Sequence, residues 1–195
     1  GNVVDAGNMV GIEHLELDGT SFSISKADIE TLITAGLEDI TGHSDSSDVT
    51  ITAANGDTVD LAGLGLESLQ SLTIDAGVGN TATVNLTAAQ INAVGSSISQ
   101  GDGSLIVSTT VAGALALGDK VENVTVTLDD DSDTILANAD ALAGVGATVT
   151  AGAVTVAEAE TLIASGLTIS YDLQDSAANL LSAPSNVYVN AATLE

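Results

Sequence analysis

The sequence predicts a repeat solenoid, predominantly parallel β with short capped α-helices, in which each circuit of the chain packs on the next. Two observations favour this fold class. A fourteen-residue segment occurs twice, and short runs that alternate apolar and polar residues return every twenty-odd residues, separated by Gly, Asn and Asp. A compact α/β domain with a parallel sheet is the alternative, because the spacing between the copies is irregular.

The repeated segment predicts a short helix in each copy. Residues 24–37 align without gaps to residues 154–167, with seven of the fourteen positions identical. Both copies, and a fainter one starting at Leu86, begin with a hydroxyl residue followed three positions later by an acid or amide, which is typical of a capping box. Gly36 and Gly166 lie where a left-handed residue ends a helix. We therefore expect residues 24–37 and 154–167 to occupy equivalent positions in two repeats. The capping pairs are Ser25–Asp28, Thr155–Glu158 and Thr87–Gln90.

A second recurring pattern, in which an apolar residue is followed by Glu, any residue and another apolar residue, predicts strands. It begins the runs 12–17, 66–74 and 121–126, and its glutamates, Glu13, Glu67 and Glu122, are almost evenly spaced along the chain. Apolar residues then alternate with polar ones, as in a strand with one buried face. Further strands are expected at residues 49–52, 58–61, 81–86, 105–109, 147–154, 167–171 and 187–190.

We expect one repeat-built domain over residues 1–193, excised from a larger protein, with residues 194–195 as a cloning scar. The chain has 195 residues, of which 45% are hydrophobic, and this is enough for a sizeable core. Because only Phe22, Tyr171 and Tyr188 are aromatic, that core must consist of Ala, Val, Ile and Leu.

The charge balance excludes several classes of protein. Against 27 acidic residues the chain has only Lys26 and Lys120, so its net charge is −25. Two cations cannot neutralise a nucleic acid or an anionic membrane surface. The absence of Cys excludes disulfide scaffolds and zinc sites of the Cys type. No apolar run approaches the ~20 residues that span a bilayer, so we expect no membrane insertion.

Catalysis is not expected. A polysaccharide lyase needs cations beside the substrate carboxylate, and two lysines supply few. A glycoside hydrolase needs only two carboxylates, which are available, but three aromatic residues offer few platforms for sugar rings. Neither His14 nor His43 lies in a G-x-S-x-G context that would activate a serine. A polysaccharide-hydrolysing β-solenoid enzyme is kept as an alternative.

The densest acidic cluster, residues 129–133, is the candidate metal site. Asp129, Asp131 and Asp133 have the 1-3-5 spacing of a calcium loop. Thr134 stands where an EF-hand requires Gly, so the hypothesis is a looser calcium site at a strand–helix junction. The competing interpretation is a solvated acidic turn with Asp133 as a helix N-cap. Residues 45–48, beside His43, form a second acidic loop.

Thr-x-Thr pairs begin at Thr50, Thr81, Thr125 and Thr148, at clearly unequal intervals along the chain. These unequal intervals predict no regular threonine rank, and the β-propensity of Thr explains the pairs. Crowded carboxylates without cationic partners are expected to have raised pKa values, so stability should increase as the pH falls.

Residues 11–17, Gly-Ile-Glu-His-Leu-Glu-Leu, resemble the recurrent G-I-E-T-L-x-L strand of bacterial surface-layer proteins and of type I-secreted haemolysin-type (RTX) adhesins. Residues 175–180 are similar to the D-T-A-A-N-L repeats of other giant exported bacterial proteins. The resemblance implies β-solenoid architecture, export to the cell surface and calcium as a structural ion. The calcium-binding nonapeptide G-G-x-G-x-D of that family is absent, and residues 101–103 are only a fragment of it.

These observations together predict a non-catalytic structural or adhesive segment of a large exported bacterial cell-surface protein, either an adhesin or a surface-layer component. Its expected partners are neighbouring repeats, copies of the same protein and surface polysaccharide. The alternative is a calcium-dependent module that binds carbohydrate or a surface.

Overall fold

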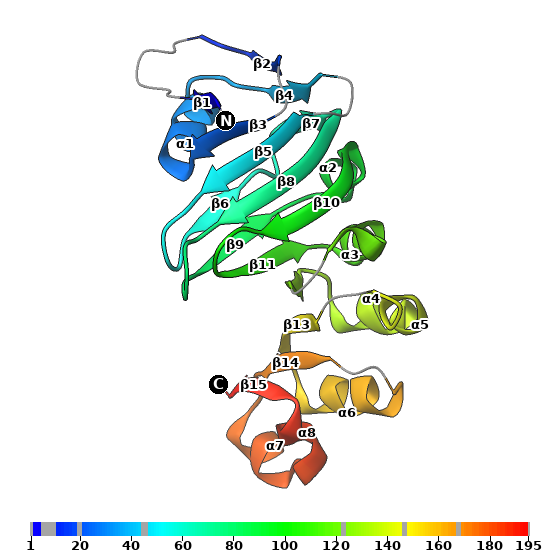
Figure 1. Cartoon of the computed structure of the whole chain (residues 1–195). Helices are drawn as coiled ribbons and strands as arrows, with labels where there is room; N and C mark the ends of the chain where they lie inside the picture. Colours follow the sequence, from blue (N-terminus) through cyan, green and yellow to red (C-terminus); the bar gives the residue numbers. More distant parts are fainter. Residues whose placement is uncertain are drawn as a thin grey trace.

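The computed structural model describes residues 2–4, 11–18, 21–43, 47–121, 124–145, 148–166 and 169–194. It has an α/β architecture of short strands and short helices (Figure 1). The strands form three sheets, which we name A, B and C, and every strand pair in them is parallel. The predicted parallel strands and short helices are therefore present, in an arrangement that also fits the compact α/β alternative.

Sheet A contains β1 (Asn2–Val4), β3 (Ser21–Ser25), β5 (Ser47–Thr52), β8 (Leu69–Asp75) and β10 (Val94–Gln100). Sheet B contains β2 (His14–Leu17), β4 (Asp39–Gly42) and β7 (Gly65–Glu67). Sheet C contains β6 (Thr58–Asp60), β9 (Thr81–Asn85), β11 (Ser104–Thr109), β12 (Thr125–Leu128), β13 (Thr148–Val154), β14 (Ser170–Leu173) and β15 (Ala191–Leu194). The helices are α1 (Lys26–Thr34), α2 (Ala88–Ala93), α3 (Val111–Leu117), α4 (Ser132–Ala137), α5 (Ala139–Leu142), α6 (Val156–Ala164), α7 (Ala177–Ser182) and α8 (Ser185–Val189), with a 3₁₀ turn η1 (Gly118–Lys120) after α3.

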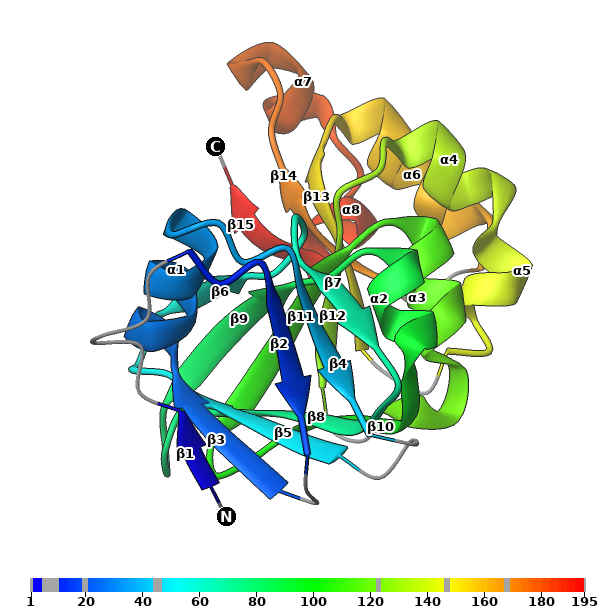
Figure 2. The same ribbon diagram turned by 90° about the horizontal axis from the view of Figure 1, so that it is seen from above.

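The chain visits the sheets in rotation, and within each sheet the strands follow one another in chain order. From β4 it passes through sheets B, A and C twice, and Figure 2 shows these sheets around a common interior. After β9, helix α2 takes the place of a sheet B strand and contacts β7. Later circuits each place a helix after a sheet C strand, so that α2, α3, α4 and α6 line one side of the molecule (Figure 1). The circuits differ in length, because the register partners Ile106 and Thr125 are closer in sequence than the partners Thr58 and Thr83.

The core is aliphatic, as the composition predicts. Parallel register places like residues side by side: Val59, Val84, Val107 and Val126 form one fully buried row of sheet C. Burying such side chains is worth ~1.5–3 kcal/mol each. Tyr171 is the exception, because it is fully buried and donates its hydroxyl to the carbonyl of Val187 at 2.7 Å.

The predicted helix starts are confirmed. Ser25, Thr87 and Thr155 each accept a hydrogen bond from the backbone N–H three residues on, and the last two form complete capping boxes. Gly36 and Gly166 follow α1 and α6 with φ of +107° and +78°, the left-handed region that ends a helix at little cost only for Gly.

The two copies of the repeated segment do not occupy equivalent places in the fold, contrary to the prediction. Segment 24–37 leaves sheet A, and its helix α1 stands between sheets A and B where a sheet C strand would otherwise pass. Segment 154–167 leaves sheet C, and its helix α6 belongs to the row of helices on the other side (Figure 1). A capping box is a local signal. It starts a helix wherever a strand ends, and it carries no information about the sheet to which that strand belongs.

One predicted strand, 187–190, is wrong. Residues Ser185–Val189 form helix α8 directly after Pro184, whose fixed φ suits the start of a helix. The Glu-containing pattern also fails to mark equivalent strands. Its copies fall in sheet B, across β7 and β8, and beside β10 at Val121 before β12, with residues 122–123 outside the described ranges. Within the described residues, no helix is long and apolar enough to span a membrane.

Candidate functional site

The acidic cluster lies where the chain leaves sheet C and enters the helices. Parallel register aligns Asp60, Asn85 and Ser108 at the carboxyl ends of β6, β9 and β11. Helices α2 and α3 start beside these ends, at their caps Thr87 and Thr110. Together with Asp129 these residues line a shallow hollow of about 310 Å³, which we name the corner hollow.

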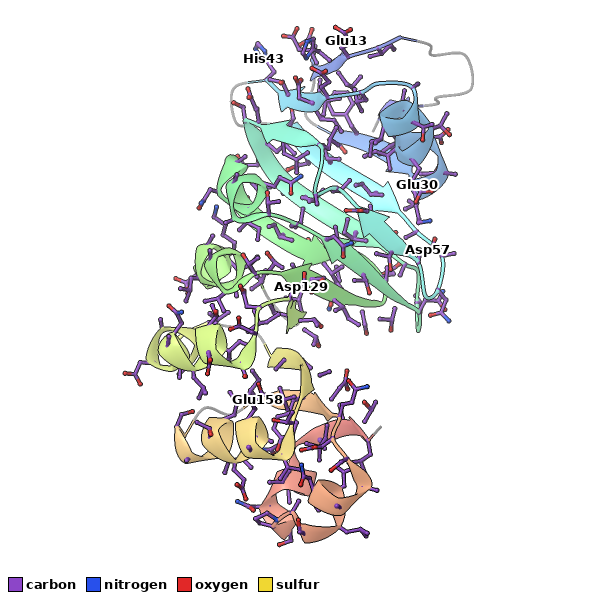
Figure 3. The ribbon with its side chains drawn as sticks, turned by 180° about the vertical axis from the view of Figure 1, so that it is seen from behind. Glu13, Glu30, His43, Asp57, Asp129 and Glu158 are labelled. Atoms are coloured by element: carbon purple, nitrogen blue, oxygen red, sulfur yellow. The ribbon has the colours of Figure 1, made fainter. Side chains whose placement is uncertain are left out.

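Asp129 is the only one of the three predicted calcium ligands that lines the corner hollow. It follows β12, and the hydroxyl of Ser108 lies 3.1 Å from both of its carboxylate oxygens. Its backbone N–H donates to the carbonyl of Thr109 at 3.0 Å. Figure 3 shows Asp129 beside the sheet C strands, with Glu158 further along the stack.

The other two predicted ligands have different surroundings. Asp131 is the N-cap of α4 and accepts from the backbone N–H of Thr134 at 2.8 Å, which lowers the pKa of Asp131. Asp133 lies exposed in the first turn of α4, so the expectation that it caps the helix is wrong. Asp131 is preferred because its extended backbone aims its carboxylate at the free N–H groups. Within the described residues no three His, Asp or Glu side chains group so as to hold a metal ion. Calcium at Asp129, Asp131 and Asp133 therefore stays a prediction.

Residues 44–46 of the second acidic loop lie outside the described residues. Its last residue, Asp48, belongs to β5 and accepts from the Ser71 hydroxyl of β8 at 2.6 Å. His43 donates its backbone N–H to Ser47 Oγ at 3.0 Å. The other histidine, His14 on β2, donates Nδ1–H to Asp39 Oδ2 on β4 at 2.5 Å, and this hydrogen bond raises the pKa of His14.

Two acidic side chains that sequence reasoning missed cap helices of a neighbouring circuit. The carboxylate of Asp130, just after β12, accepts from the N–H of Val111, the first residue of α3. Asp175, just after β14, accepts in the same way from Val156 at the start of α6, at 3.1 Å. A negative charge at a helix N-terminus is stabilised by the free N–H groups and the helix dipole.

Hydrogen bonds lower the pKa values of two further acids in this row. The Ser132 hydroxyl, in the first turn of α4, donates to Glu158 of α6 at 2.6 Å, and this bond is the main reason for the lowered pKa of Glu158. Asn179 does the same for Asp175, donating at 2.8 Å. The helix caps at positions 87, 110, 131, 155 and 176, all Ser, Thr or Asp, recur at nearly equal intervals. That recurrence is the sequence signal that would have found this row.

Both lysines are engaged within the molecule. Lys120 donates to the carbonyls of Ile91 at 2.9 Å and Val94 at 2.7 Å, where α2 ends. Cations belong at this negative end of a helix. Lys26 of α1 pairs with Glu30 at 3.0 Å and with Asp57 at 3.8 Å, and the Glu30 contact raises the pKa of Lys26. Figure 3 shows Glu30 on the helix above Asp57, so this ion pair ties α1 to the loop before β6.

The Thr-x-Thr pairs join regular polar rows, contrary to the prediction. On the outer side of sheet A, register aligns Ser23, Thr50, Thr73 and Ser99, and the last two hydroxyls are 3.1 Å apart. On sheet C, Thr127 pairs with Thr150, whose hydroxyl lies 3.0 Å from that of Ser170. The unequal intervals arose because the pairs belong to two sheets and are joined by loops of different lengths. Figure 2 shows no helix over the outer face of sheet A in the described part of the chain.

Fold and site together define an α/β protein of three parallel sheets, whose polar side chains connect its own strands and helices. No protein-family model matches the chain, and no curated protein or solved structure matches it either.

Proposed function

We propose that the chain is a non-catalytic structural segment of a large exported bacterial cell-surface protein, an adhesin or surface-layer component, in which it serves as a stiff acidic spacer. The observation that carries this proposal is the continuous stack of strands, in which all three sheets add their strands in chain order. We take this stack to be a solenoid.

Bonds between neighbouring circuits support the solenoid interpretation. Lys120 satisfies the carbonyls at the end of α2, and Asp130 and Asp175 satisfy N–H groups at the starts of α3 and α6. Gln90 likewise donates its amide to the carbonyls of Leu61 and Leu64. Each circuit completes the hydrogen bonding of the one before it, which is the nearest-neighbour coupling that stacked repeats depend on.

The surface location is proposed from the sequence. The charge of −25 and the absence of Cys are typical of exported bacterial proteins, and residues 11–17 and 175–180 resemble strands of surface proteins. A spacer rather than an enzyme is favoured because both lysines are engaged in structural contacts and the one fully buried aromatic, Tyr171, offers no platform for a sugar.

Removing one whole circuit tests the solenoid. Deleting residues 132–155 joins the cap Asp131 directly to Val156, so α6 takes the place of α4. We expect this variant to stay folded and to unfold cooperatively at a lower temperature, because a stack of repeats loses only one interface. The matched control deletes residues 143–166, an equal number out of phase with the repeat, and should unfold. Equal loss of structure in both variants would favour the compact domain.

The spacer role is tested by pulling the chain between its ends in single-molecule force spectroscopy. We expect it to extend in steps of about one circuit, and to release no reducing ends from acidic or neutral polysaccharides. Polysaccharide turnover that is lost in Asp60→Asn or Asp129→Asn would replace the proposal with the hydrolase alternative, because a hydrolase depends on two carboxylates.

A calcium-dependent module that binds carbohydrate or a surface is the second candidate, and the corner hollow favours it, because Asp60 and Asp129 both line this polar hollow. Thermal melts in millimolar calcium against chelator, with magnesium as the control for charge screening, test this candidate. A calcium-specific rise in Tm that is lost in Asp129→Asn would support it. At a hundredfold excess over Kd, such an ion would add about 2.7 kcal/mol.

A further inference from the structure

The C-terminal end of the stack exposes apolar side chains that the rest of the described surface buries. Of the six large hydrophobic residues exposed in the described chain, four lie within α7, α8 and β15. Leu181 is 89% exposed, Val189 80% and Leu194 59%, and Tyr188 is 36% exposed. We name these four residues the C-terminal face. Figure 1 shows α7, α8 and β15 together at this end of the molecule.

An edge strand lies at the same end. β15 is the last strand of sheet C in the described part of the chain, and it pairs with β14 on one side. At the opposite end of sheet C, by contrast, α1 is tied over the edge strand β6 through Lys26 and Asp57. An edge strand presents backbone N–H and C=O groups that can pair with another strand.

Charge identifies the partner that this end can accept. Residues 176–194 contain no Asp, Glu, Lys or Arg, whereas the whole chain carries −25. Two copies of the chain therefore repel each other over most of their surfaces. The C-terminal face lets two copies meet without bringing carboxylates together, and its apolar side chains gain by leaving water.

We propose that two copies of this chain associate end to end through the C-terminal face, with β15 of each copy pairing antiparallel to β15 of the other. A two-fold axis makes the contact self-complementary, because the same patch is used on both copies. The same axis reverses one strand relative to the other, which makes the new pair antiparallel and continues sheet C across the dimer. This inference does not rest on the proposed function.

Sedimentation equilibrium of the full chain over micromolar concentrations tests the dimer. We expect the wild-type mass to double with concentration and the association to tighten at higher salt, because salt screens the repulsion between the acidic surfaces. Leu181→Asp and Val189→Asp should keep the protein monomeric. Both side chains are almost fully exposed, so neither substitution removes core packing. Val78→Asp is the matched control: its side chain is 84% exposed between β8 and β9, away from this face, and it should leave the dimer unchanged.

Cross-linking tests the strand pairing. The chain has no Cys, so Ala192→Cys in the middle of β15 introduces a single thiol that would meet its own counterpart at the two-fold axis. Mild oxidation should give a covalent dimer for Ala192→Cys and none for Val78→Cys. A wild-type protein that stays monomeric at every concentration would overturn the proposal. A dimer that Val189→Asp leaves intact, or that Ala192→Cys does not cross-link, would overturn it as well.

Discussion

At the scale of the residue, charged side chains act in this protein mainly as backbone caps. Lys120 covers carbonyls at the end of one helix, while Asp130 and Asp175 cover N–H groups at the starts of two others. Each comes from a different circuit than the helix it serves, so one side chain both ends a helix and joins two circuits. A highly acidic chain can therefore use its few cations and some of its carboxylates for stability.

Lys120→Met should lower the free energy of unfolding by about 1.5–3 kcal/mol, because two backbone carbonyls lose hydrogen bonds from a charged donor. Met keeps the apolar stem, so the change reports the ammonium group. Lys26→Met is the matched control. Its ion pairs are exposed, and we expect a clearly smaller effect. Urea unfolding curves of the two variants measure the difference, and equal effects would contradict the assignment.

At the scale of the element, helix starts are set by short capping signals that recur at nearly equal intervals from Thr87 to Ser176. These signals are strong because most of the helices are too short to be stable alone. The cap chooses where a helix begins, and packing against the neighbouring circuit keeps it folded.

Asp131→Ala should lower the midpoint of thermal unfolding, because α4 loses the side chain that accepts from Thr134 N–H. Asp133→Ala, two residues on in the same acidic cluster, should leave the midpoint within error, since Asp133 is exposed in the first turn of the helix. Both variants lose one negative charge, so the pair separates capping from net charge. A larger effect of Asp133→Ala would show that the sequence-based choice of cap was correct.

At the scale of the whole molecule, the pKa shifts oppose what charge crowding alone predicts. Hydrogen bonds lower the pKa values of Asp131, Glu158 and Asp175. A lowered pKa means that the folded state binds the proton less readily than the unfolded state does. These groups therefore stabilise the fold above the pKa of an ordinary carboxyl, about 4, and the contribution is lost as the pH falls through their lowered values.

Thermal melts at pH 3, 6 and 8 should accordingly give the highest midpoint near pH 6. The raised pKa of His14, held by Asp39, adds stability below its ordinary value of about 6.5 that disappears as the pH rises through the folded-state value. Acid then removes the carboxylate caps. Glu158→Gln should flatten the acid side of the profile. A midpoint that keeps rising down to pH 3 would mean that relief of carboxylate repulsion outweighs the loss of the caps.

The sequence by itself determined the local structure: the aliphatic core, the strands with one buried face, and the helix starts at Ser25, Thr87 and Thr155. These follow from hydrophobic periodicity and capping chemistry, which act over a few residues. Only the tertiary structure decided which sheet each strand joins, that 187–190 turns as helix α8 behind Pro184, and that irregularly spaced threonines fall into register. It also separated Asp129, Asp131 and Asp133, because a hydrogen bond from Ser108 and a helix start at Asp131 engage two neighbouring acids in different ways. Contacts between residues a whole circuit apart depend on loop lengths and packing, and the order of residues along the chain does not state them.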